Sequence, residues 1–138
     1  MQQFQVRTRN RSEMVEITSR VREAIGETGV RQGLCVVYCP HTTAAITINE
    51  NADPDVKSDL LAKLSALVPK DESYYCHAEG NSDSHLKAAM VGHSVTVLIE
   101  GGRLVLGRWQ GVYFCEFDGP RERELFVKPL SFRPTGAS

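Results

Sequence analysis

The last third of the chain is built from short apolar runs separated by turn residues, and it contains no helical repeat. The runs lie at residues 95–99, 104–106, 112–117 and 124–128. Gly101 and Gly102 are typical of a hairpin turn after the first run, and Asp118-Gly119-Pro120 is typical of a turn before the last one. This ending favours a β-rich fold in which neighbouring strands form hairpins.

The first two thirds add more strands and bring the helical patterns together. Further strand-like runs lie at residues 4–6, 14–17, 34–39 and 44–48. Three segments combine capping residues with apolar residues at helical spacing, and they lie at 18–29, 53–69 and 82–91. Their expected first residues are Thr18 or Ser19, Asp53, and Ser82 or Asp83.

About eight strands with about three bunched helices indicate an α+β fold rather than a regularly alternating parallel sheet. No Pro- or Ser-rich linker or internal repeat divides the 138 residues. We therefore expect a single compact domain over residues 1–132 with a mixed or antiparallel sheet. Residues 133–138 are expected to form a C-terminal tail.

Charge and hydropathy exclude two classes of partner. The chain has 16 Lys and Arg against 17 Asp and Glu, and this net charge of −1 lacks the cationic excess that drives binding to nucleic acid. Its longest apolar stretch, residues 34–39, is far shorter than the roughly 20 residues needed to cross a bilayer. Because the polar N-terminus also has no signal region, we expect no membrane partner and a cytoplasmic location.

The four cysteines favour packing over metal binding. Cys35 and Cys39 lie in one strand-like run, where four residues span ~13 Å, too far for one ion to bind both thiolates. Cys76 and Cys115 are isolated beside aromatic residues. We interpret all four as small buried residues of a reducing compartment.

Histidines and a carboxylate gather at the junctions between the predicted elements. His41 lies where two strands break, and His77, Glu79 and His85 lie close together before and within a helix. If the fold brings His41 to the others, three imidazoles and a carboxylate are a ligand set for a divalent metal. The alternative is that His77 and His85 only bond backbone groups near helix ends.

Acidic residues and arginines flank the last predicted turn. Glu116 and Asp118 alternate on one strand face, where paired carboxylates suit Mg²⁺ or acid–base work. Arg121 and Arg123 are also two residues apart, and guanidinium groups suit phosphate or carboxylate. The alternative is an ordinary salt-bridged hairpin.

Other polar residues fit no simple packing role, and no nucleophile is evident. Glu50 and Asn51 precede the predicted helix without a capping role, and Gln110 follows the only tryptophan, Trp109. The sequence contains no Gly-x-Ser-x-Gly motif and no serine or cysteine paired with histidine in a recognised pattern. Covalent catalysis is therefore not indicated.

Three ordered blocks of motifs cover nearly the whole chain. The first comprises His41-Thr42-Thr43-Ala44, Ile48-Asn49-Glu50-Asn51 and Asp53-Pro54-Asp55. The second comprises Asn81, His85-Leu86-Lys87 and Gly92, and the third comprises residues 94–102, Gly107, Trp109-Gln110 and residues 116–121. In this order they resemble the YjbQ-like family, also called the secondary thiamine-phosphate synthase family. Arg108 departs from the pattern, which leads us to expect threonine there.

The resemblance implies a compact α+β domain that assembles as a homotrimer, with its polar site close to subunit contacts. It also implies thiamine-phosphate synthase activity, which joins an aminopyrimidine diphosphate to a thiazole phosphate with loss of pyrophosphate. A charge at Arg108 alters ligand preference if that position faces the site, and has no such effect if it faces solvent.

On this basis the first hypothesis is a metal-dependent enzyme that acts on phosphorylated small molecules. The expected catalytic residues are His41, Glu50, Asn51, Asp118 and Arg121. The expected substrate-binding residues are Thr42, Thr43, Asn81, Gln110 and Arg123. The expected ligands of a Mg²⁺ or Zn²⁺ ion are His41, His77, Glu79 and His85. The alternatives are a non-catalytic trimeric protein that binds a metal or small ligand, and a subunit whose polar residues only join the trimer.

Overall fold

The computed structural model describes residues 1–132, which form three helices and eight strands as expected. The helices are α1 (Thr18–Thr28), α2 (Pro54–Leu67) and α3 (Ser82–Val91). The strands are β1 (Gln2–Arg7), β2 (Glu13–Glu16), β3 (Gly33–Tyr38), β4 (Ala44–Glu50), β5 (Ser94–Glu100), β6 (Arg103–Leu104), β7 (Gln110–Glu116) and β8 (Glu122–Ser131). The predicted tail at 133–138 lies outside the described residues.

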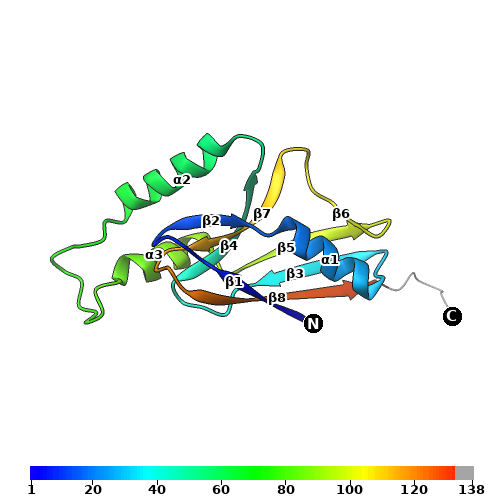
Figure 1. Cartoon of the computed structure of the whole chain (residues 1–138), viewed down its shortest axis with the longest axis horizontal. Coiled ribbons are helices and arrows are strands. Elements are labelled where there is room, and N and C mark those ends of the chain that lie inside the picture. Colours follow the sequence, from blue (N-terminus) through cyan, green and yellow to red (C-terminus); the bar gives the residue numbers. More distant parts are fainter. Residues whose placement is uncertain (133–138) are drawn as a thin grey trace.

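The strands form two antiparallel sheets rather than the single mixed or antiparallel sheet that was expected (Figure 1). The larger sheet has the order β1-β8-β3-β5-β6, and the smaller one has the order β2-β7-β4. Each strand pair in both sheets is antiparallel. The α+β class and the single compact domain that the sequence indicates are thereby confirmed.

The main core is formed by the facing surfaces of the two sheets and by α1. Val37 of β3 and Phe114 of β7 are fully buried there. The predicted apolar face of α1, namely Val21, Ala24 and Ile25, is buried in the same cluster. The burial of these side chains supplies the main hydrophobic stabilisation of the fold.

Local details of the helices differ from expectation. No side chain caps α1, because the Thr18 hydroxyl donates to Glu16 and accepts the Val112 amide hydrogen instead. Asp53 caps α2 as predicted, by accepting the Asp55 amide hydrogen. However, no residue of α2 is fully buried, and Leu67 at the end of its apolar stripe is 58% exposed.

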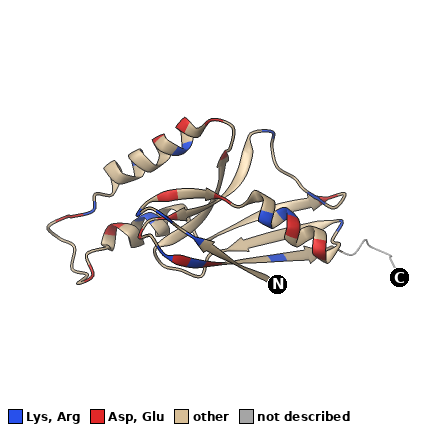
Figure 2. Ribbon diagram, viewed as in Figure 1, with Lys and Arg blue, Asp and Glu red and all other residues tan. Residues whose placement is uncertain are grey.

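Three of the four cysteines are buried and free, as predicted, whereas Cys76 is exposed. Within residues 1–132 no helix is both long and apolar enough to cross a membrane. Lysines and arginines are mixed with aspartates and glutamates over the described chain (Figure 2).

The pairing of β4 with β7 places two groups of predicted site residues apart. Ala44, which follows Thr43, lies opposite Glu116, whereas Glu50 lies opposite Gln110. Glu50 lies six residue steps along the strand from Ala44, which corresponds to ~20 Å. Residues near Glu116 and residues near Gln110 therefore belong to different parts of the surface.

Candidate functional site

A polar pocket of about 290 Å³ lies where the β3–β4 connection, the start of α3 and the β7–β8 turn meet. It is lined by Pro40 and nine of the predicted site residues: His41, Thr42, Thr43, Glu79, Asn81, His85, Asp118, Arg121 and Arg123. These residues come from three separate stretches of the sequence. Their convergence makes this pocket the candidate site.

His41 is held at the pocket wall by a backbone hydrogen bond. Its Nε2 accepts the Glu124 amide hydrogen at 2.8 Å, so this nitrogen carries no proton. Partial burial and the charge of Arg123 lower the pKa of His41 below its ordinary value. The imidazole is therefore neutral near pH 7, with its proton on Nδ1.

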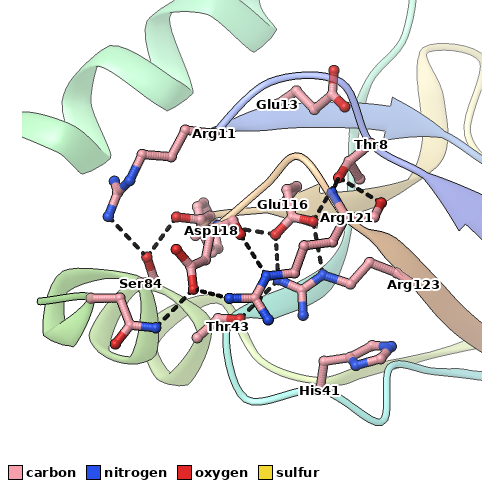
Figure 3. A network of polar contacts seen from close by, with 12 residues as sticks. Thr8, Arg11, Glu13, His41, Thr43, Ser84, Glu116, Asp118, Arg121 and Arg123 are labelled. Atoms are coloured by element: carbon pink, nitrogen blue, oxygen red, sulfur yellow. Dashed lines mark hydrogen bonds and ion pairs between the residues drawn. The ribbon is translucent and has the colours of Figure 1, made fainter. Parts of the chain in front are cut away.

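Glu116 and Arg123 form a buried ion pair beneath the pocket (Figure 3). Glu116 is 0% and Arg123 4% exposed, and the Arg123 guanidinium binds both carboxylate oxygens, with Nε 2.8 Å from Oε1. The carboxylate also accepts hydrogen bonds from the Thr8 hydroxyl and the Asp118 amide. The same guanidinium donates to Thr43 Oγ1. Glu116 is therefore the structural counterion of Arg123.

Asp118 and Arg121 form the second acid–arginine pair, at the mouth of the turn. Arg121 Nη2 lies 2.8 Å from Asp118 Oδ2, and Arg121 Nε donates to the Asp118 carbonyl. Asn81 Nδ2 donates to the same Oδ2 at 2.7 Å, which joins the start of α3 to the turn. Among the described residues none donates to Asp118 Oδ1. Gly119 permits the turn to pack against the β1–β2 connection, since a Cβ there would lie 2.4 Å from the Asn10 carbonyl oxygen.

Asn81 carries an unsatisfied acceptor. The residue is 6% exposed, and its Oδ1 is buried without a hydrogen-bond partner in the described part of the chain. A buried acceptor without a donor costs about 1–3 kcal/mol. Such groups in native proteins call for an explanation. One explanation is a ligand or ion that binds the unpaired oxygen.

A buried cluster that the sequence reasoning did not identify fixes α3 beside the pocket. Asp83, at 0% exposed, binds Lys87 Nζ at 3.0 Å and both terminal nitrogens of Arg11. Ser84 Oγ donates to the Phe117 carbonyl at 2.6 Å. The ion pair between Asp83 and Lys87 could have been predicted, because the two residues are four positions apart on a predicted helix. The link to Arg11 depends on the tertiary fold.

The four predicted metal ligands are only partly brought together. His77 and His85 lie edge to face with ring centroids 5.3 Å apart, and His77 Nε2 lies 3.7 Å from Glu79 Oε2. His77 lines a neighbouring apolar hollow rather than the pocket with His41. In residues 1–132 no three His, Cys, Asp or Glu side chains are placed to hold a metal together.

Three predicted site residues lie at the opposite end of β4 and β7. Glu50 accepts the Ala52 amide hydrogen, and Asn51 Nδ2 donates to Glu16 and to the Gln110 carbonyl. Gln110 Oε1 accepts the Gly107 amide hydrogen at 2.7 Å. These contacts close the local turns. Within one copy of the chain the three side chains do not join the pocket.

Arg108 and Trp109 lie at this distant end as well. The Arg108 guanidinium lies over the Trp109 ring, 4.7 Å from its centroid, and both residues are exposed. Arg108 therefore faces solvent rather than the pocket, and its charge has no direct effect on a ligand bound there.

The charged residues that line the pocket balance one another. Two are carboxylates, Glu79 and Asp118, and two are arginines, Arg121 and Arg123. Arg123 is additionally paired with the buried Glu116. With a neutral His41, the pocket offers positive groups at defined positions but no excess of positive charge.

Together, the fold and the pocket define a small α+β domain of two antiparallel sheets with an acid–arginine site at one end. The chain belongs to the family described as UPF0047 protein YjbQ-like, whose family model matches residues 2–131. This confirms the resemblance carried by the three sequence blocks.

Individual relatives match over almost their full length. The UPF0047 protein YugU of Bacillus subtilis is 50% identical over 127 residues, covering 92% of this chain and 96% of that protein. A UPF0047 protein of Methanocaldococcus jannaschii is 53% identical over 125 residues, covering 91% and 90%. The crystal structure of a YjbQ/UPF0047 family protein from Clostridium acetobutylicum has a TM-score of 0.92 at 51% identity, and the match covers 94% of this chain and 100% of that one.

Proposed function

We propose that the protein is a metal-dependent enzyme of the cytoplasm that acts on phosphorylated small molecules in the pocket between His41, α3 and the β7–β8 turn. The observation that carries this proposal is the convergence of Arg121 and Arg123 with Thr42 and Thr43 in a pocket of about 290 Å³. Guanidinium and hydroxyl groups are the donors that recognise phosphate oxygens. A pocket of this size suits a small ligand rather than a polymer.

The reaction to test first is the one that the resemblance implies, a thiamine-phosphate synthase-like transfer with loss of pyrophosphate. Arg121 is the residue best placed to bind a phosphate, because its side chain is exposed at the pocket while still oriented by Asp118. His41 is a candidate hydrogen-bond donor to the ligand through Nδ1–H, since its Nε2 already accepts the Glu124 amide hydrogen. A divalent ion, Mg²⁺ or Zn²⁺, would neutralise the charge of the leaving group.

The test is the binding of inorganic pyrophosphate, measured by isothermal titration calorimetry in the presence of Mg²⁺. Replacing Arg121 with Gln is expected to weaken binding about 10- to 100-fold, the loss expected for a hydrogen bond to a charged group. Arg7→Gln is the matched control, because the exposed Arg7 also pairs with a carboxylate, that of Glu122, but lies outside the pocket. Unchanged binding in Arg121→Gln, or an equal loss in both variants, would contradict the proposal.

A non-catalytic ligand-binding protein is the second candidate function. The observation that favours it is that titratable groups at the pocket already form hydrogen bonds within the protein. Glu116 is bonded to Arg123, and His41 Nε2 accepts a backbone amide hydrogen. Burial also raises the pKa of Cys39 to about 11, so this thiol near the pocket is not a thiolate at pH 7. Tight binding of thiamine precursors without conversion would favour the binding protein.

We also propose that the chain assembles as a homotrimer through the open face of the larger sheet. On this face Leu34 lies opposite both Leu98 and Leu130, and Tyr38 stacks on Phe126. An exposed apolar patch of this kind is typical of a protein interface.

Sedimentation equilibrium tests the assembly. We expect a trimer for the unaltered protein and smaller species for Leu98→Glu, because a charge replaces a 55% exposed leucine at the centre of the apolar face. Leu67→Glu, at a similarly exposed leucine on α2, is the matched control and should remain trimeric. A monomeric unaltered protein would show that this face is not a subunit interface.

A further inference from the structure

We propose that the pocket takes its phosphorylated ligand together with a divalent cation, and that Asp118 and Asn81 are the two side chains that bind this cation. The proposal rests on the proposed function, because it assumes that a phosphate occupies the pocket. It differs from the sequence-based expectation, which assigned the cation to His41, His77, Glu79 and His85.

The arginines of the pocket are already paired with carboxylates. Arg121 is paired with Asp118, and Arg123 is paired with the buried Glu116. Glu79 adds another carboxylate to the wall. A phosphate with two or more negative charges would therefore meet no uncompensated positive charge. A divalent cation that enters with the phosphate supplies the missing charge.

Two side-chain oxygen atoms at the pocket, one on Asp118 and one on Asn81, lack a hydrogen-bond donor among the described residues. The side-chain hydrogen bonds that Asp118 accepts from the described residues all go to Oδ2, which leaves Oδ1 without a donor from the protein. Asn81 Oδ1 is buried without a partner in the same part of the chain. The two side chains are neighbours, because Asn81 Nδ2 donates to Asp118 Oδ2 at 2.7 Å. Carboxylate and amide oxygens are ligands that Mg²⁺ and Mn²⁺ prefer, whereas imidazole favours other metals.

The described residues alone offer too few ligands to complete the coordination of a metal ion. Across residues 1–132 no three His, Cys, Asp or Glu side chains are placed to hold a metal. Mg²⁺ often binds through one or two carboxylates, waters and the phosphate oxygens of the substrate. The geometry therefore implies coupled binding, in which the cation and the phosphate each increase the affinity for the other.

The experiment measures pyrophosphate binding by calorimetry with saturating Mg²⁺ and again with EDTA. For the unaltered protein we expect affinity to be at least about tenfold higher with Mg²⁺, the effect of about one charge-assisted contact. Asp118→Asn removes the carboxylate and frees Arg121 from its partner. This variant should lose the gain from Mg²⁺, that is, the increase in pyrophosphate affinity that Mg²⁺ causes. In EDTA it should bind pyrophosphate more tightly than the unaltered protein does.

Glu79→Gln is the matched control, because it removes one negative charge from the same pocket without touching Asn81 or Arg121. It should keep the gain from Mg²⁺. If both variants lose the gain, the effect follows the net charge of the pocket and the assignment to Asp118 is overturned. Loss of the gain in Glu79→Gln alone overturns it as well.

A second measurement needs no variant. The electron paramagnetic resonance signal of Mn²⁺ should report bound metal only when pyrophosphate is present. Equal pyrophosphate affinity with and without Mg²⁺, or tight Mn²⁺ binding without pyrophosphate, overturns the inference while the phosphate pocket stands. If pyrophosphate binds under neither condition, the proposed function itself fails.

Discussion

Replacing Arg123 with methionine is expected to lower the free energy of unfolding by about 3–5 kcal/mol, the usual cost of leaving one member of a buried ion pair alone. Glu116 is fully buried, and Arg123 supplies two of the hydrogen bonds that its carboxylate receives. Without Arg123 the carboxylate must stay charged in a dry environment or take up a proton. Urea denaturation followed by circular dichroism measures the loss.

The double variant Glu116→Gln with Arg123→Met separates charge from packing. Glutamine removes the isolated charge, its single carbonyl oxygen can still accept the Asp118 amide hydrogen, and its amide group can donate to the Thr8 hydroxyl. The double variant should therefore be more stable than Arg123→Met alone. If Arg123→Met lies within about 1 kcal/mol of the unaltered protein, the pair is not the structural element that we describe.

The same pair makes stability depend on pH. Burial opposes the charge of Glu116, but hydrogen bonds from Arg123, the Asp118 amide and Thr8 hold its pKa below the ordinary value of 4.5. The resulting stabilisation is present above pH 4.5 and is lost as the pH falls through the lower pKa of the folded state. Urea midpoints between pH 7 and pH 3 should therefore fall more steeply for the unaltered protein than for Arg123→Met.

Replacing Asp83 with asparagine should have a similar effect on stability and a further effect on binding. Lys87 is 3% exposed and Arg11 is partly buried, and both lose their counterion in this variant. We expect a loss of about 3–5 kcal/mol in the free energy of unfolding. Because α3 carries Asn81 at its start and His85 at the pocket wall, pyrophosphate affinity should also fall.

Two variants test the cause of this effect. Asp59→Asn removes an exposed carboxylate from α2 and should change the free energy of unfolding by less than about 0.5 kcal/mol. Asp83→Asn combined with Lys87→Met removes the unpaired buried ammonium and should recover part of the lost stability. If Asp83→Asn is no more harmful than Asp59→Asn, the cluster does not fix α3.

The strands, the helices and the fold class were predictable because they depend on local patterns. The cap at Asp53, the apolar face of α1 and the turn at Gly119 each occur where the sequence places them. The division into two sheets was not predictable, because it depends on which strands pair. The partial exposure of α2 was also not predictable from the sequence, because its leucines follow the same spacing as those of a buried helix.

For the site, the sequence identified the residue types but not all of their partners. His41, Asp118 and Arg121 were expected at element junctions and do line one pocket. Glu50 and Gln110 were grouped with them, although the antiparallel register of β4 and β7 places them at the other end of the strands. Neighbours in sequence motifs need not be neighbours in space within one copy of the chain.

The central claim is that the pocket between His41, α3 and the β7–β8 turn binds phosphate. A crystal structure of the protein soaked with Mn²⁺ and pyrophosphate tests it most directly. We predict pyrophosphate bound to Arg121 and Arg123, with the anomalous signal of Mn²⁺ beside Asp118. Pyrophosphate bound only in another hollow, such as the one lined by Arg22 and Arg103, would contradict the claim.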